Sequence, residues 1–221
     1  MSEELITIVG SSYYQPVLDL IEKMLRQPSQ KVVALRIGLR ENGYALSIVL
    51  LLVIMLESYV GRVRYLQSKS GKEKSKKERK VPEYIELLRK SFGFKKSLNE
   101  VFVLRDAIAH GHVWKLTVSD RKAYGHILCN SSLEESYGDK KYDQTVNKLT
   151  RRTRILGLNI VPTAVGRKEV LKVLDMIWRT LNFLVKHKLI ESNVTRFRGR
   201  YEGKPFDFWD IRKVIKASLE Q

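Results

Sequence analysis

Cysteine is almost absent from this chain, which has a single one, Cys129, among its 221 residues. One cysteine excludes an internal disulfide and a cysteine metal cluster, and this composition is typical of a reducing compartment. The N-terminus, Met1-Ser2-Glu3-Glu4, is acidic where a secretory leader is basic, so we expect no export. Together these features predict a cytoplasmic location.

Long hydrophobic runs are also missing. The longest uncharged apolar stretch, 44–56, is shorter than the roughly 18 to 20 residues that a bilayer crossing requires, and Arg62 and Arg64 follow it closely. We therefore interpret this stretch as a buried core helix and expect no membrane partner. The hydrophobic content of 43% is sufficient for such a core.

Several signatures of enzymes are absent as well. No glycine-rich loop precedes a Lys-Ser or Lys-Thr pair, and the chain has no His-Glu-x-x-His or paired-cysteine motif for zinc. We therefore set aside nucleotide transfer, kinase and metalloprotease activities, and we expect neither a metal nor a cofactor.

Positive charge, in contrast, is in large excess. The chain has 41 lysines and arginines against 24 aspartates and glutamates, a formal net charge of +17. A surplus of this size attracts polyanions over a long range, and nucleic acid is the first candidate. An acidic protein partner, an anionic membrane face and simple solubility remain as alternatives.

The spacing of apolar residues predicts a mainly α-helical protein. Helices are expected with Pro16 as an early residue, over 44–65, from Pro82, and over 167–186. The helix at 44–65 is apolar on nearly all sides through Met55, which places it at the centre of a bundle.

One further helix precedes the most informative motif. Ser97 is expected to cap this helix, with Glu100 at the third position of a capping box, and Gly111 to end it. From Val113 the pattern changes to alternation, which predicts an antiparallel hairpin over 113–129 with its turn at Ser119-Asp120.

The sequence thus predicts a single domain, 1–221. Its bundle core is expected at about 44–111 and 166–188, with a β-like insert at about 112–162. A basic C-terminal tail at 189–221 is expected to hold a loop, with Arg196, Arg198, Arg200 and Lys204, and a last helix near 206–219.

Residues 105–110, Arg-Asp-Ala-Ile-Ala-His, combine a permanent cation, a carboxylate and a titratable imidazole at the end of a helix. Asp106 and His110 are four residues apart and share a helical face, so the carboxylate could orient the ring. Arg105 is about 140° from His110 around an ideal helix, so a single chain aligns the two poorly. A dimer would help, because two copies could supply the arginine and the histidine, and Ala107 and Ala109 would permit close approach of their backbones.

The pattern of Arg105, Asp106 and His110 resembles the Arg-polar-x3-His signature of HEPN domains. These helical bundles include many ribonucleases of toxin–antitoxin, abortive-infection and CRISPR-associated systems. The resemblance covers the helices of 44–110 and the later helix from Arg167, about half of the chain. It implies a HEPN-like bundle acting as a metal-independent endoribonuclease and homodimer. It also implies a toxin or defence effector. A third alternative is that the chain is one half of a complex whose neighbour, an antitoxin protein, silences or modifies it.

Each motif residue would then have a distinct role. His110 would take the proton of an RNA 2′-hydroxyl or protonate the leaving 5′-oxygen. Arg105 would bind the scissile phosphate through two N–H groups, and Asp106 would hold the imidazole or the arginine. The internal nucleophile makes RNA rather than DNA the expected substrate, with 2′,3′-cyclic phosphate ends implied by the resemblance.

Basic clusters outside the motif are expected to contact RNA. One lies in the stretch 69–80, which has seven basic and two acidic residues and could equally be a solvated linker. The predicted RNA-binding residues are Lys76, Lys77, Arg151, Arg152, Arg196 and Arg198.

The main alternative is a non-catalytic HEPN-like helical module that binds nucleic acid or a protein. A histidine near a helix C-terminus is stabilised by the helix dipole alone, and Arg105 and Asp106 could be ordinary surface ion partners. The same arginine-to-histidine spacing recurs from Arg121 to His126, inside the predicted hairpin. Glu57 is expected either to line the same cleft or to mark where its helix emerges into water.

Overall fold

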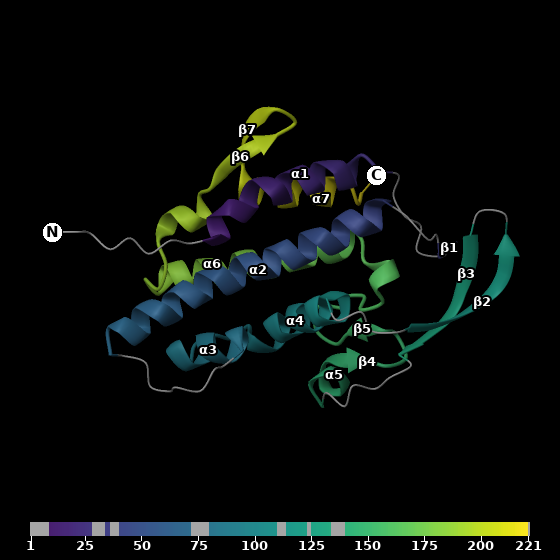
Figure 1. The fold of residues 1–221 in the computed structure, drawn as a ribbon, viewed down its shortest axis with the longest axis horizontal. Helices are drawn as coiled ribbons and strands as arrows, with labels where there is room; N and C mark the ends of the chain where they lie inside the picture. Colours follow the sequence, from purple (N-terminus) through teal and green to yellow (C-terminus); the bar gives the residue numbers. More distant parts are fainter. Residues whose placement is uncertain are drawn as a thin grey trace.

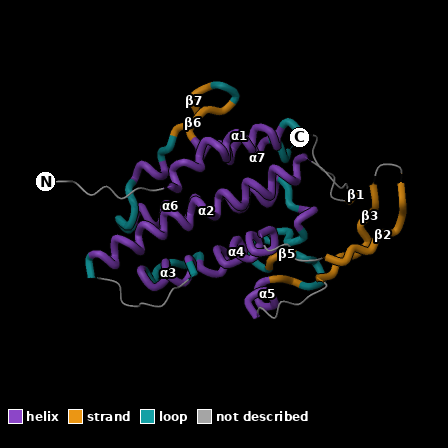
Figure 2. The backbone as a smooth tube through the Cα atoms, in the orientation of Figure 1, coloured by secondary structure: helices purple, strands orange, loops and turns teal. Residues whose placement is uncertain are grey.

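The computed structural model describes residues 9–27, 34–35, 40–71, 80–109, 114–122, 125–133 and 140–220. Helices dominate these ranges, and the strands form small antiparallel sheets (Figures 1 and 2). The predicted class, mainly α with a small antiparallel β insertion, is therefore confirmed at this level.

The α-helices are α1 (Tyr14–Leu25), α2 (Arg40–Lys69), α3 (Val81–Leu88), α4 (Lys95–Ala109), α5 (Lys140–Thr145), α6 (Arg167–Lys186) and α7 (Ile211–Ala217). Short 3-10 turns lie at η1 (Val9–Tyr13), η2 (Pro162–Ala164), η3 (Ser192–Thr195) and η4 (Phe208–Asp210). The bounds of α6 are those predicted, and α2 extends beyond the predicted helix at both ends.

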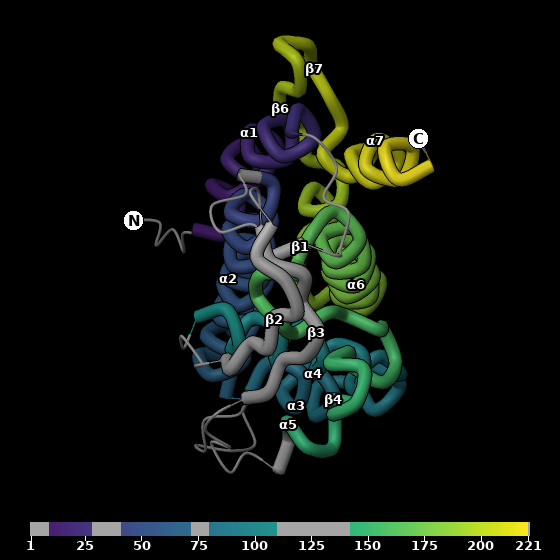
Figure 3. The backbone as a smooth tube through the Cα atoms, turned by 90° about the vertical axis from the view of Figure 1, so that its right-hand side faces the viewer, coloured from purple at the N-terminus to yellow at the C-terminus, as the bar shows by residue number. Residues whose placement is uncertain are grey.

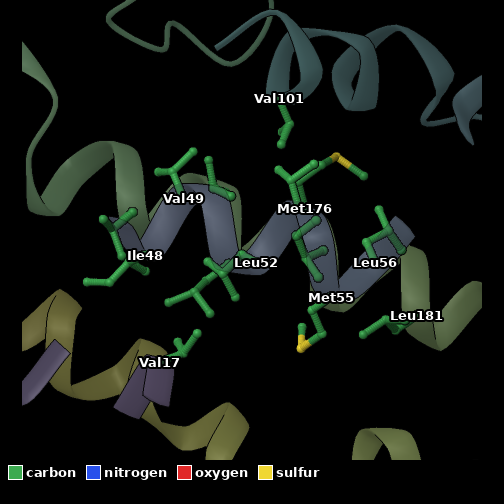
Figure 4. Packing of buried hydrophobic residues seen from close by; sticks show 14 of the residues in the cluster. Val17, Ile48, Val49, Leu52, Met55, Leu56, Val101, Met176 and Leu181 are labelled. Atoms are coloured by element: carbon green, nitrogen blue, oxygen red, sulfur yellow. The ribbon is translucent and has the colours of Figure 1, made fainter. Parts of the chain in front are cut away.

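Helix α2 lies at the centre of the bundle, with α1 on one side, α4 on the other and α6 behind it (Figure 1). Its buried residues, such as Ile48 and Leu52, form one cluster with Val17 of α1, Val101 of α4 and Met176 of α6 (Figure 4). Length and composition would allow the part of α2 from Glu41 to Lys69 to cross a membrane, but half of its most apolar window is buried inside the protein. Here α2 is the core helix.

Helix α4 begins at Lys95, two residues before Ser97, so Ser97 lies inside the helix and does not cap it. Glu100 is almost completely buried, with 1% of its surface exposed. Its two carboxylate oxygens accept backbone N–H groups of Ile155 and Leu156 at 2.7 and 2.6 Å. The predicted capping box is therefore wrong, because Glu100 instead fastens a distant loop to α4.

The predicted hairpin exists, but its turn is not where the sequence suggested. Strand β2 (Trp114–Lys122) pairs with β3 (Gly125–Leu133), and the short β1 (Ala34–Leu35) pairs with the other edge of β3. Ser119 and Asp120 lie within β2, where the register shifts between Val118 and Arg121. A bulge of this kind absorbs extra residues without ending the strand.

Two further hairpins complete the fold. Strand β4 (Val146–Asn147) pairs with β5 (Arg152–Thr153), and β6 (Arg198–Tyr201) pairs with β7 (Lys204–Asp207). The basic segment predicted as a loop is thus a β-hairpin, and the last helix is confined to α7.

Tyr14 connects α1 to the C-terminal segment. Its hydroxyl donates to the backbone oxygen of Val194 at 2.8 Å, and its ring stacks on Phe197 with centroids 4.2 Å apart. Burial, together with the neighbouring Tyr59 hydroxyl, raises the pKa of Tyr14 far above its ordinary value. The folded protein therefore requires this phenol to stay neutral.

This burial predicts a loss of stability at high pH. Above pH of about 10 the unfolded chain loses phenol protons that the folded chain retains, so stability falls by about 1.4 kcal/mol per pH unit for each such tyrosine. Replacement Tyr14→Phe should make this decline shallower than in the unsubstituted protein. Urea denaturation at a series of pH values from 8 upward measures it, and equal slopes would contradict the prediction.

Removal of the Glu100 carboxylate should destabilise the fold strongly. Glu100→Ala leaves two N–H groups without a charged acceptor, and we expect the free energy of unfolding to fall by about 3 kcal/mol. Lys96→Ala, an exposed position on the same helix, should change it by less than about 0.5 kcal/mol. A similar small effect for both variants in urea denaturation would show that Glu100 does not anchor the loop.

Candidate functional site

Arg105 and Asp106 lie near the C-terminal end of α4, where the chain turns from buried to half-buried positions. Leu104 and Ala107 on the same turn are buried in the core and fix the helix against its neighbours. The two charged side chains therefore occupy the border between core and solvent, where a ligand can reach them.

The guanidinium of Arg105 is held by two carboxylates. Its Nη2 donates to Oε1 of Glu57 on α2 at 3.0 Å, and its Nε lies 3.1 Å from Oδ1 of Asp106. The Nε–H is not aimed at Asp106, so this second contact is electrostatic rather than a hydrogen bond. The guanidinium carbon also lies 5.4 Å from the centre of the Phe102 ring.

These three charged groups make a site with a net negative charge, one cation against two anions. Glu57 is the side chain that the sequence suggested for the same cleft, and the structure places it against Arg105. His110, the predicted acid–base group, lies outside the described residues, as do Lys76 and Lys77. The described part of the motif thus consists of Arg105 and Asp106, with the Arg105 guanidinium held beside the carboxylates of Asp106 and Glu57.

A basic loop, which includes Arg151 and Arg152, lies against the same helix. Val103 of α4 packs with Val146 and Ile160 on either side of this loop, and Glu100 holds its backbone at Ile155. Arg151 therefore lies on an element that is fixed directly to the helix bearing Arg105.

The two arginines predicted in this loop differ in their surroundings. Arg152 donates from Nη1 to the backbone oxygen of Gly157 at 3.1 Å, and the same nitrogen lies 3.9 Å from Glu169. Arg151 has a positive φ of 55° and forms no ion pair with a described residue. The Arg152 side chain thus helps to hold the loop together, whereas the charge of Arg151 is not paired with a described residue.

Arg196 and Arg198 lie on the other side of the bundle. The β6–β7 hairpin projects beyond α1, while α4 lies across α2 from it, in both views of the molecule (Figures 1 and 3). The structure therefore does not bring these arginines to the Arg105 site. The predicted RNA-binding residues fall into separate surfaces instead of one groove within the chain.

The arginines of these surfaces differ from those elsewhere in the protein in whether their side chains have partners. Arg62, Arg167 and Arg212 each pair with a carboxylate. Among the arginines whose side chains the structure describes, a smaller set forms no ion pair, hydrogen bond or ring contact. These are Arg151, Arg154, Arg196, Arg198 and Arg200, and the predicted RNA-binding residues include three of them but not Arg154 or Arg200.

The second arginine-to-histidine spacing has a simple structural origin. Arg121 and His126 are cross-strand partners in the register of β2 and β3. This spacing closes a hairpin and is unrelated to the helical motif.

No group of three His, Cys, Asp or Glu side chains that could hold a metal ion occurs among the residues that the structure describes. Comparison of the chain with protein-family models, with curated proteins and with solved structures finds no match.

The Arg105–Glu57 pair should contribute little to stability. Its side chains are 26% and 36% exposed, whereas those of the Arg167–Glu41 pair are 8% and 5% exposed. Glu57→Gln should lower the free energy of unfolding by less than about 1 kcal/mol, because partly exposed pairs are screened by water. Glu41→Gln should lower it by about 3 kcal/mol, because Arg167 stays buried with its countercharge removed.

Urea denaturation of both variants tests this contrast. A fall in the free energy of unfolding above about 2 kcal/mol for Glu57→Gln would mean that the Arg105–Glu57 pair stabilises the fold and does not exchange readily with a ligand.

Proposed function

We propose that this protein is a metal-independent endoribonuclease of the HEPN type, active as a homodimer. In this proposal Arg105 binds the scissile phosphate and His110 transfers the proton. A role as a toxin or defence effector, held in check by a protein partner, belongs to the same proposal.

The observation that carries the proposal is the placement of Arg105. Its guanidinium is partly exposed, is oriented by Glu57 and Asp106, and leaves Nη1 without a hydrogen bond to any residue in the described ranges. An oriented guanidinium offers a planar pair of N–H donors that matches two oxygens of a phosphate. The net charge of +17 would bring RNA to the protein.

The reaction would proceed by internal displacement at phosphorus. The 2′-oxygen attacks the phosphorus, the bond to the 5′-oxygen breaks, and one proton moves from the 2′-hydroxyl to the leaving group by way of His110. Arg105 would stabilise the charge that builds on the phosphate oxygens, exchanging its contact with Glu57 for one with the substrate. The balanced products are a 2′,3′-cyclic phosphate and a 5′-hydroxyl.

Two chains would complete the site. Arg105 and His110 are five residues apart, about 140° around an ideal helix, so residues from two copies satisfy the geometry better than one. A closed two-fold dimer is the commonest assembly of soluble proteins.

A second candidate is a non-catalytic module that binds nucleic acid. It is favoured by one specific observation, the occupation of Arg105 by two carboxylates. In that case the exposed arginines elsewhere would bind the nucleic acid, and Arg105 would only connect α4 to α2.

Cleavage of RNA by the purified protein tests the proposal. We expect cleavage in the presence of a metal chelator, 2′,3′-cyclic phosphate ends, and no cleavage of an all-deoxy substrate of the same sequence. Arg105→Ala and His110→Ala should each lower the rate by at least about 100-fold.

His126→Ala is the matched control, because it removes the histidine of the second arginine-to-histidine spacing and should leave the rate unchanged. Intact RNA across the range from acid to alkaline pH, with binding that survives His110→Ala and does not distinguish RNA from DNA, would favour the second candidate instead.

A further inference from the structure

The hairpin of β6 and β7 forms a basic arm, residues 196–207, that projects beyond α1 (Figure 1). Its strands are joined by Glu202 and Gly203, which have φ values of 49° and 74°. Two successive positive φ values are the mark of the tight two-residue turn that matches the twist of a hairpin. The arm is therefore a regular ribbon.

Helix α1 holds this arm in a fixed position. The amide of Gln15 accepts the backbone N–H of Arg200 at 2.8 Å and donates to its backbone oxygen at 2.9 Å, as a neighbouring strand would. Gly199 lies so close to α1 that an added Cβ would come within 2.6 Å of Leu18 and 2.8 Å of Gln15. The arm is thus fastened along one face before any ligand arrives.

The opposite face of β6 carries an arginine on either side of Gly199. Gly199 faces α1, so Arg198 and Arg200 face outward, and Arg196 lies two residues before the strand begins. All three side chains are exposed, as is Lys204 near the tip. Arginines two apart on a strand are separated by about 7 Å, close to the distance between successive phosphates of an extended nucleic-acid strand.

Carboxylates on and near the arm form no ion pair with its arginines. Asp207, the cross-strand partner of Arg198, accepts the backbone N–H of Trp209. Glu22 pairs with Arg26 and also accepts the backbone N–H of Glu202 at 3.1 Å, and Asp19 accepts a hydrogen bond from Gln15. Within the described part of the chain, the three arginines and Lys204 outnumber the two carboxylates of the arm, Glu202 and Asp207, so the arm keeps a positive charge for an external anion.

The backbone of the arm is poorly suited to another use, the addition of a strand from a partner. Pro205 lies in β7 and supplies no N–H, and Gln15 occupies the edge of β6 at Arg200. The outer face of the arm is therefore suited to recognition through its side chains.

We propose that this arm is a binding site for the phosphate backbone of single-stranded nucleic acid, separate from the Arg105 site. Arg196, Arg198 and Arg200 contact successive phosphates, without reading the bases. Contacts limited to phosphates bind RNA and DNA strands alike. The arm would retain a strand on the face of the bundle opposite α4, whether or not Arg105 takes part in cleavage.

Binding of a labelled single-stranded oligonucleotide to the full chain, followed by fluorescence anisotropy across a salt series, tests the arm. An all-deoxy strand prevents cleavage, and RNA is measured in the His110→Ala background. Arg198→Gln with Arg200→Gln should weaken binding of both strands about tenfold at low salt. It should also reduce the slope of log Kd against log salt by about 1.4, or about 0.7 per lost phosphate contact.

Three comparisons make the result specific. Lys90→Gln with Lys96→Gln removes the same charge from exposed positions on the α3–α4 side and should leave the slope nearly unchanged. Arg198→Lys with Arg200→Lys keeps the charge and should retain most of the affinity. Gln15→Ala keeps every charge but releases the arm, and should weaken binding less than the double glutamine variant does.

Equal losses for the arm variant and the lysine control would overturn the proposal, as would equally tight binding of polyglutamate, which would indicate an acidic protein partner. Failure of cleavage in the unsubstituted protein would count against the ribonuclease and leave the arm intact.

Discussion

The apolar character of α2 on nearly all sides is the constraint from which the remaining structure follows. A helix of this kind is stable in water only when neighbours cover it, and α1, α4 and α6 do so. The arrangement separates the protein into two sides, with α1 and the basic arm on one and α4 with its loop on the other. Each side presents its own unpaired arginines.

Packing of α4 on α2 also creates the candidate site. It places Arg105 against Glu57, a residue 48 positions earlier in the chain, and leaves the pair at the boundary with solvent. The Arg167–Glu41 pair is buried and closes the core. The Arg105–Glu57 pair is partly exposed, so it remains accessible for exchange with a ligand. This accessibility is what a phosphate ligand would require.

Local signals in the sequence predicted the helices well and the tertiary contacts poorly. The amphipathic pattern of α6 gave its bounds correctly, because one face meets the core along its whole length. Glu100 fits a capping box by spacing, but its carboxylate serves a loop more than 50 residues later, which no local pattern reveals. The arm was mistaken for a loop, because its pairing depends on positive φ values at Glu202 and Gly203 and on support from Gln15.

The central claim is that Arg105 of one chain and His110 of another act on the same phosphate, and subunit complementation tests it most directly. Arg105→Ala and His110→Ala proteins, each inactive alone, are mixed under conditions that allow dimers to exchange, and RNA cleavage is measured. A mixed dimer contains one site with both functional residues, so the account predicts that cleavage reappears in the mixture. A mixture that exchanges subunits and stays inactive, while the unsubstituted protein cleaves RNA, would contradict it.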